Sequence, residues 1–189
     1  MARWALLLGP KGSGKSNDAL DVIAKLRARG LSAAGFVQVG WTDTLERRGH
    51  DLMRVRDGSR MHLARPGTQE GQGEEAFCSF VFTQAAFDTA REWVTRDGPG
   101  SDVVVFDEVS KLEAAGKGHH EAIAWAMGRP DVSVVLTCVR ADQLFYVMEK
   151  FQLQEEPFAM LEVPCDEEAK AAFAEAIAQA CVAGAATAG

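Results

Sequence analysis

A glycine-rich segment near the start of the chain has the residue types needed to hold a phosphate group. Residues 9–16 read Gly-x-x-x-x-Gly-Lys-Ser, with an apolar run before them and a helix-type pattern after them. Glycines let the backbone turn its N–H groups toward an anion, and the N-terminus of the following helix adds a favourable dipole. The residues expected to surround the phosphates are Gly9, Pro10, Lys11, Gly12, Ser13, Gly14, Lys15, Ser16 and Asn17. The segment predicts a nucleotide phosphate-binding loop.

Two side chains of this loop are expected to take part in catalysis and metal binding. Lys15 can bring its charge to the β- and γ-phosphate oxygens, and the Ser16 hydroxyl suits a ligand of Mg²⁺. A nucleoside triphosphate such as ATP or GTP is therefore the expected substrate, and Mg²⁺ is the expected cofactor.

A pair of acidic residues follows an apolar run in the middle of the chain. Residues 103–106 read Val-Val-Val-Phe, which is typical of a buried strand, and Asp107 and Glu108 come directly after them. Asp107 is predicted to support the Mg²⁺ together with Ser16. Glu108 is predicted to orient or deprotonate an attacking water. A Glu directly after the Asp favours hydrolysis over phosphoryl transfer to a second substrate.

A threonine at the end of another apolar run is a candidate sensor of the γ-phosphate. Residues 132–136 predict a buried strand that reaches Thr137. We expect this strand to lie between the phosphate-loop strand and the strand before Asp107, which would bring Thr137 close to the γ-phosphate. The alternative is a threonine that only finishes a strand.

Strands that alternate with helices must position these residues. Apolar runs predict strands within 4–8, 33–39, 77–82, 103–106, 132–136 and 158–163. Helical spacing of apolar residues predicts helices at 16–29, 84–96, 119–127 and 142–151, and a final helix after Asp166. This alternation predicts an α/β protein of three layers, a P-loop NTPase fold of the additional-strand, catalytic-Glu type with a mainly parallel sheet.

One insertion interrupts this plan. Alternating residues around an Asp-Gly pair at 57–58 predict a β-hairpin, the one antiparallel element that we expect. The hairpin and the hydrophilic loop at 66–75 belong to an insertion over 43–82. Residues 43–65 contain six arginines and no lysine, and arginine suits bidentate contacts with phosphate. A solvated hairpin face is the alternative.

Length and composition set further limits. The chain has 189 residues, 47% apolar and 25% charged, so we expect one domain over 1–182 with a flexible tail at 183–189. The formal charge of −7 argues against a dedicated nucleic-acid or anionic-membrane binder. No apolar stretch reaches the roughly 18 residues of a membrane span. Four cysteines without a Cys-x-x-Cys pair are expected to be reduced, in a cytoplasmic protein.

The order of these motifs resembles a known family. The loop at 9–16, the Gly35-Phe36 pair before the arginine-rich hairpin, and Asp-Glu-Val-Ser-Lys-Leu-Glu at 107–113 are similar to the small P-loop nucleoside-triphosphatase family, typified by a thermophile enzyme and a human cancer-related enzyme. The resemblance implies slow, Mg²⁺-dependent hydrolysis of several nucleoside triphosphates to diphosphate and phosphate. Arg47 and Arg48 match an arginine pair of that family, which makes Arg48 a candidate catalytic residue.

Residues after the acidic pair also match family positions. Lys111 and Glu113 do so, although an exposed ion pair explains them equally well. His119 and its neighbour His120 could be read as metal ligands, but adjacent helical residues point about 100° apart, which favours surface positions at a helix N-terminus. This chain departs from the family at Ser16-Asn17, where Thr-Thr is usual, and at Ser110, where Gly is usual.

Two other functions fit the same motifs. One is a nucleotide-dependent switch or accessory protein, for example in molybdenum-cofactor handling, with a protein partner on the hairpin and loop at 43–75. The other is a small-molecule kinase, which needs an acceptor pocket and an arginine-bearing lid. The sequence offers no place for such a lid between Val132 and Pro164.

Overall fold

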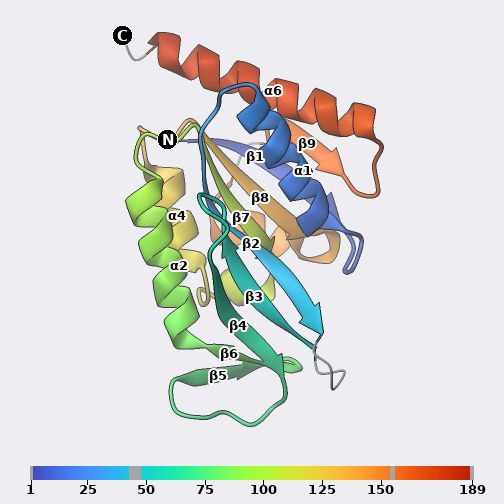
Figure 1. Ribbon diagram of the computed structural model, residues 1–189, viewed down its shortest axis with the longest axis vertical. Coiled ribbons are helices and arrows are strands. Elements are labelled where there is room, and N and C mark those ends of the chain that lie inside the picture. Colours follow the sequence, from blue (N-terminus) through green and yellow to red (C-terminus); the bar gives the residue numbers. More distant parts are fainter. Residues whose placement is uncertain (1, 43–47, 154–155, 188–189) are drawn as a thin grey trace.

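The central part of the sheet is parallel. The computed structural model describes residues 2–42, 48–153 and 156–187 (Figure 1). Within these residues nine strands form one sheet in the order β5-β6-β4-β3-β2-β7-β8-β1-β9. Its parallel strands are β1 (Arg3–Gly9), β2 (Ala33–Thr42), β7 (Val103–Val109), β8 (Val134–Arg140) and β9 (Ala159–Glu162). The additional strand β8 lies between β1 and β7, which confirms the predicted fold class.

Helices cover both faces of this parallel part (Figure 1). On one face, α1 (Lys15–Ala28) and α6 (Glu167–Thr187) pack around Leu7. On the other, α2 (Gln84–Asp97) and α4 (His120–Gly128) pack around Leu6. The shorter helices are α3 (Lys111–Ala114) and α5 (Leu144–Lys150), the latter preceded by a 3-10 turn at Ala141–Gln143.

The structure also bears on the expected C-terminal tail, on the cysteines and on membrane-spanning helices. Helix α6 continues to Thr187, so the tail expected from residue 183 is helical up to that point, and residues 188–189 lie outside the described part. The four cysteines are free, as expected. None of the described helices has both the length and the apolar character needed to cross a bilayer.

The other half of the sheet is antiparallel and larger than the sequence predicts. Strands β3 (Arg48–Arg54) and β4 (Arg60–Pro66) form the expected hairpin around Asp57 and Gly58. A second hairpin follows, made of β5 (Glu74–Phe77) and β6 (Phe80–Thr83). The prediction of a single strand at 77–82 and of one antiparallel element is therefore wrong. The turn of this second hairpin lies at Cys78, which has a left-handed φ of 55°. Cysteine is not a typical turn residue, so the sequence gives no signal for this turn.

Gly35 lets the two halves of the sheet meet. It has a φ of 98° on β2, and a Cβ atom there would lie 2.0 Å from the carbonyl oxygen of Val105 on β7. The next residue, Phe36, packs edge-on against Phe106 with the ring centroids 5.6 Å apart. Strand β2 pairs with β7 only as far as these two phenylalanines and then continues alongside β3. The strands therefore separate directly above the acidic pair.

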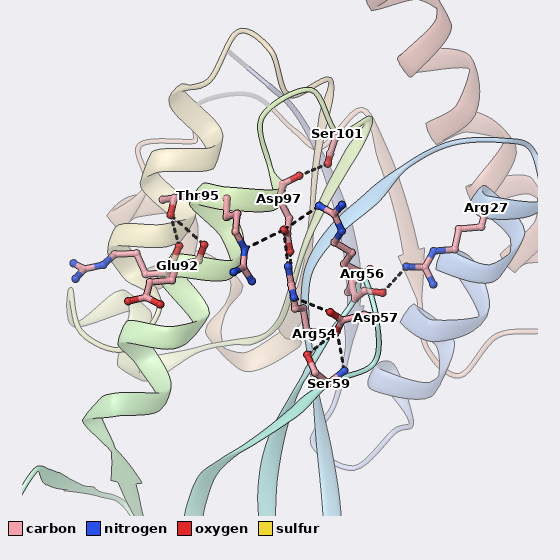
Figure 2. Close-up of polar contacts among 12 residues, drawn as sticks. Arg27, Arg54, Arg56, Asp57, Ser59, Glu92, Thr95, Asp97 and Ser101 are labelled. Carbon is pink, nitrogen blue, oxygen red and sulfur yellow. Dashed lines mark hydrogen bonds and ion pairs between the residues drawn. The ribbon is translucent and has the colours of Figure 1, made fainter.

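An arginine cluster fixes the β3–β4 turn to the end of α2 (Figure 2). Arg54 donates from Nε and Nη2 to the two carboxylate oxygens of Asp97, both at 2.7 Å, and Arg56 adds a bond of 3.2 Å. The side chain of Asp97 is only 2% exposed. On β4, Arg65 pairs with Glu74 at 2.7 Å. Several arginines of the hairpin therefore hold the fold together and are not free to contact phosphate.

Candidate active site

The predicted phosphate loop joins the end of β1 to the start of α1. Gly12 and Gly14 have φ values of 74° and 94°, a conformation that side-chain-bearing residues rarely adopt. The Lys15 side chain folds back over the loop, where Nζ donates to the carbonyl oxygen of Pro10 at 2.8 Å. The Ser13 hydroxyl is buried without a partner among the described residues. The loop therefore presents the ammonium group of Lys15 and the unpaired hydroxyl of Ser13 where the sequence predicts the phosphates.

Asp107 lies beneath this loop and contacts Ser16, as the metal prediction requires. Its carboxylate accepts hydrogen bonds from the Gln38 N–H at 3.0 Å and from the Glu108 N–H at 2.8 Å, and the Ser16 hydroxyl also bonds to it. Burial raises the pKa of Asp107 to about 6, which the bond from Ser16 opposes. A nearby cation would favour the ionised carboxylate.

The donor set fits Mg²⁺ when a nucleotide supplies further oxygens. A hydroxyl and a carboxylate are hard oxygen ligands, and Mg²⁺ is commonly held by one or two protein groups together with phosphates and waters. The described residues contain no group of three or more His, Cys, Asp or Glu that could hold an ion without a ligand. Ser16 and Asp107 are therefore the residues that would hold the metal.

Glu108 is turned into the cavity by an irregular strand end. It has a left-handed φ of 55°, and the register between β7 and β8 shifts between Phe106 and Val109. Such bulges re-aim side chains and are frequent beside active sites. Glu108 consequently lines a cavity of about 600 Å³ together with Lys15 and Ser16. Its carboxylate shares one space with the phosphate loop, as the prediction of a water-activating residue requires.

Thr137 does not reach this cavity, because β8 is longer than the sequence predicts. The strand runs to Arg140, so Thr137 is fully buried in its middle, beside Leu6 and Phe106 in the neighbouring strands. The Trp4 indole N–H donates to the Thr137 hydroxyl at 2.8 Å. The expected position at the strand end was therefore wrong. Arg140 holds that position, lines the cavity and pairs with Asp142 at 2.7 Å.

Arg48 is not brought to the phosphate loop either. It is exposed at the start of β3, opposite Thr42, and is not among the residues that line the cavity. Its predicted partner Arg47 lies outside the described residues. The cavity instead receives His50 from the same strand. Partial burial lowers the pKa of His50, so this imidazole favours its neutral form.

Two titratable residues of the cavity are buried, although the sequence analysis favoured a surface position for His119 and left an exposed ion pair as an alternative for Glu113. Glu113 is 3% exposed, and its carboxylate accepts from the backbone N–H of Ser110 at 3.0 Å and of His119 at 3.2 Å. Burial raises the pKa of Glu113 to about 7 and lowers that of His119 to about 3. The Ser-x-x-Glu spacing at 110–113 is a capping box, a signal from which the inward position of Glu113 could have been predicted.

Comparison with known proteins places this chain in a family. Residues 5–174 match the family described as NTPase. This chain belongs to the NTPase family. A mouse cancer-related nucleoside-triphosphatase homologue is 28% identical over 144 residues, which are 72% of this chain and 75% of that protein. The resemblance noted from the motifs and the assignment to the nucleoside-triphosphatases are confirmed.

Two solved structures share the NTPase fold. The human cancer-related nucleoside triphosphatase superimposes with a TM-score of 0.68 at 23% identity, over 96% of this chain and 97% of that one. THEP1 from Aquifex aeolicus gives a TM-score of 0.53 at 20% identity, over 92% of this chain and 96% of that one.

A longer protein also shares sequence with this member of the NTPase family. A catalase-peroxidase of Burkholderia mallei is 30% identical over 129 residues, which are 66% of this chain. The chain spans only 18% of that relative, so the peroxidase name belongs to a much longer protein.

Proposed function

We propose that this NTPase hydrolyses nucleoside 5′-triphosphates, ATP and GTP among them, to the diphosphate and phosphate with the help of Mg²⁺. The observation that carries this proposal is the shared cavity of Glu108 and the phosphate loop, with Asp107 and Ser16 in contact beneath it. A water beside the terminal phosphate would have a carboxylate at hand to take its proton.

Each residue then has a separate task. The backbone N–H groups of the loop bind the phosphates, and Lys15 exchanges its bonds to the loop carbonyls for bonds to phosphate oxygens. Ser16 and Asp107 hold the Mg²⁺, which neutralises charge on the phosphates when it is bound. Glu108 accepts a proton from the attacking water, a step that typically contributes about 10²–10⁴-fold in rate.

Phosphate release tests this proposal. Purified protein is assayed with ATP, GTP, CTP and UTP in the presence of Mg²⁺ and again with a chelator in excess. We expect release that requires Mg²⁺ and that falls to a trace in Lys15→Ala, because the loop loses the side-chain cation that folds over it. Lys25→Ala is the matched control, since Lys25 pairs with Glu167 on the surface at 2.9 Å. Unchanged turnover in Lys15→Ala would contradict the proposal.

A further inference from the structure

The cavity beside the phosphate loop is also lined by aromatic residues that have no task in the proposed hydrolysis step. We name this part the aromatic chamber, lined by His50, Phe77, Phe80, Phe82, Phe87 and His119. A water molecule takes up about 30 Å³ of the liquid, whereas the whole cavity holds about 600 Å³. Sites for small organic molecules have volumes of about 300–1,000 Å³. The cavity can therefore accommodate more than a phosphate chain and a water.

Five rings form a continuous wall of the aromatic chamber. His50 lies 5.0 Å from Phe80, which is 6.5 Å from Phe82. Phe82 stacks on Phe87 at 5.8 Å, and Phe87 contacts His119 at 4.8 Å. The rings come from β3, β6, α2 and the residue before α4, so the tertiary fold brings them together. Such a wall favours a flat ring as its ligand, because aromatic rings stack or pack edge-to-face.

The polar groups of the chamber suit an uncharged ligand. His119 Nδ1 is buried without a partner in the described part of the chain, although buried polar atoms are almost always paired. Leaving such an atom unsatisfied costs free energy. Burial keeps His119 neutral, whereas the charged residues of the same cavity, such as Lys11, Lys111 and Arg140, are not among the six residues that define the chamber. The rings and the neutral His119 are therefore suited to an uncharged ring.

The β5–β6 hairpin forms a fixed wall of the cavity. The residues of its turn, Cys78 and Ser79, line the cavity. Its first strand is tied to β4 through the ion pair of Glu74 and Arg65, at 2.7 Å, and Glu75 pairs with Lys117. These contacts preorganise the wall, so that a ligand does not have to order it on binding.

We propose that the aromatic chamber is an acceptor subsite, which binds an uncharged aromatic or heteroaromatic alcohol whose hydroxyl takes the γ-phosphoryl group in place of water. This proposal rests on the proposed function, because the same loop and the same Glu108 do the chemistry. Glu108, the phosphate loop and the six residues of the chamber line one cavity, so a hydroxyl on a ring bound in the chamber would share this cavity with the carboxylate and the terminal phosphate.

The transfer step balances without any further reactant. The hydroxyl oxygen forms a bond to the γ-phosphorus while the bond from this phosphorus to the β–γ bridging oxygen breaks. The hydroxyl proton passes to Glu108. The products are a phosphate monoester of the alcohol and a nucleoside diphosphate. Water gives free phosphate by the same step when the aromatic chamber is empty.

The test compares transfer with hydrolysis in one reaction. Protein, Mg²⁺ and γ-³²P-labelled ATP are incubated with benzyl alcohol, 3-(hydroxymethyl)pyridine or tryptophol, and monoester and free phosphate are separated and counted. Cyclohexylmethanol is the non-aromatic control. We expect a labelled monoester with at least one aromatic alcohol, and a ratio of monoester to phosphate at least tenfold lower with cyclohexylmethanol.

Variants locate the acceptor. Phe82→Ala should lower the ratio of monoester to phosphate at least tenfold, because it removes the central ring of the wall. Phe145→Ala is the matched control on α5, where the ring is 72% exposed, and should leave the ratio unchanged. Phe82→Leu removes the ring but keeps most of its volume, and replaces Phe82→Ala if that variant does not fold.

Each negative result has a distinct meaning. Phosphate release without a monoester from any of the alcohols would overturn the acceptor subsite and leave hydrolysis in place. If neither the monoester nor free phosphate is formed, the proposed function itself is contradicted. A higher KM of Phe82→Ala for ATP, with an unchanged KM for inorganic tripolyphosphate, would show that the aromatic chamber holds the nucleotide base and would also overturn the acceptor.

Discussion

The backbone N–H of Glu108 donates a hydrogen bond of 2.8 Å to the carboxylate of the residue before it, Asp107. This bond forms where Glu108 adopts a left-handed φ of 55° and the strand pairing is interrupted. The two neighbouring carboxylates therefore separate: Asp107 is buried beside Ser16, whereas Glu108 lines the cavity. This separation suits the two roles proposed for them, metal binding for Asp107 and proton transfer from the attacking oxygen for Glu108.

Glu108→Gln should separate binding from chemistry. The side chain keeps its size and its hydrogen bonds but can no longer accept the proton, so we expect nucleotide affinity to persist while single-turnover hydrolysis falls by about 10²–10⁴-fold. Asp107→Ala should weaken the binding of Mg²⁺ and nucleotide together. Titration calorimetry and rapid-quench kinetics measure the two quantities. A Glu108→Gln rate within about threefold of wild type, far from this loss, would exclude Glu108 as the base.

Arg54→Met should destabilise the protein more than the same change at another arginine. The change leaves the buried Asp97 paired only with Arg56 and with its sequence neighbour Arg96. Breaking a buried ion pair typically costs about 3–5 kcal/mol. Arg129→Met is the matched control, because Arg129 forms an equally bidentate pair with Asp131 that is exposed, and solvent screening makes such pairs contribute little to stability.

Urea unfolding of both arginine variants gives the comparison. Equal losses in the free energy of unfolding would show that the buried pair in Figure 2 does not hold the turn to α2.

Gly35→Ala should prevent a stable fold, whereas Gly58→Ala should be tolerated. Both glycines have a positive φ, which costs a side-chain-bearing residue about 1–2 kcal/mol. Only at Gly35 would the added Cβ overlap with the backbone of Val105; around Gly58 there is nothing within 4 Å. Thermal unfolding should show a fall in Tm of a few degrees for Gly58→Ala and no cooperative transition for Gly35→Ala. Similar Tm values would contradict the close approach of β2 to β7.

Glu113 should make the protein less stable as the pH rises. Its pKa is raised from 4.5 to about 7 in the folded protein, so the folded state binds a proton more tightly than the unfolded chain does. The free energy of unfolding should therefore fall between about pH 4.5 and pH 7, by up to about 3 kcal/mol at about 1.4 kcal/mol per pKa unit.

Glu113→Gln isolates this contribution. The variant should be less stable than wild type at pH 5, because the protonated carboxyl group keeps an oxygen opposite each of the two N–H donors, whereas the amide places an NH₂ opposite one of them. Because glutamine does not titrate, the difference in the free energy of unfolding between the variant and wild type should become smaller toward pH 7. Asp107 titrates in both proteins and cancels in the comparison. A difference that stays constant with pH would show that Glu113 keeps an ordinary pKa in the folded state.

Features that depend on neighbouring residues could be predicted from the sequence. The phosphate loop and the Asp107-Glu108 pair are defined by local spacing, and the Asp-Gly pair predicts the first hairpin. The place of β8 between β1 and β7 also followed, because a Glu after the Asp is typical of sheets with that additional strand. These features are encoded within a few residues of each other.

The remaining features depend on contacts between distant segments. Thr137 was misplaced because nothing local shows that the strand continues to Arg140, and its hydroxyl is paired by Trp4 from another strand. The β5–β6 hairpin has strands of only four residues, too short for a clear alternation. His119 is polar in sequence and becomes buried only because rings of β2 and α2 pack on it.

The division of the sheet at Gly35 has a consequence for how such proteins can diversify. The parallel strands carry the phosphate loop and the acidic pair, whereas the chain from Arg48 to Phe87 supplies five of the six residues that line the aromatic chamber. These five residues belong to one continuous segment of the chain. Substitutions in this single segment can therefore change the lining of the aromatic chamber without changing the residues of the phosphate loop or the acidic pair.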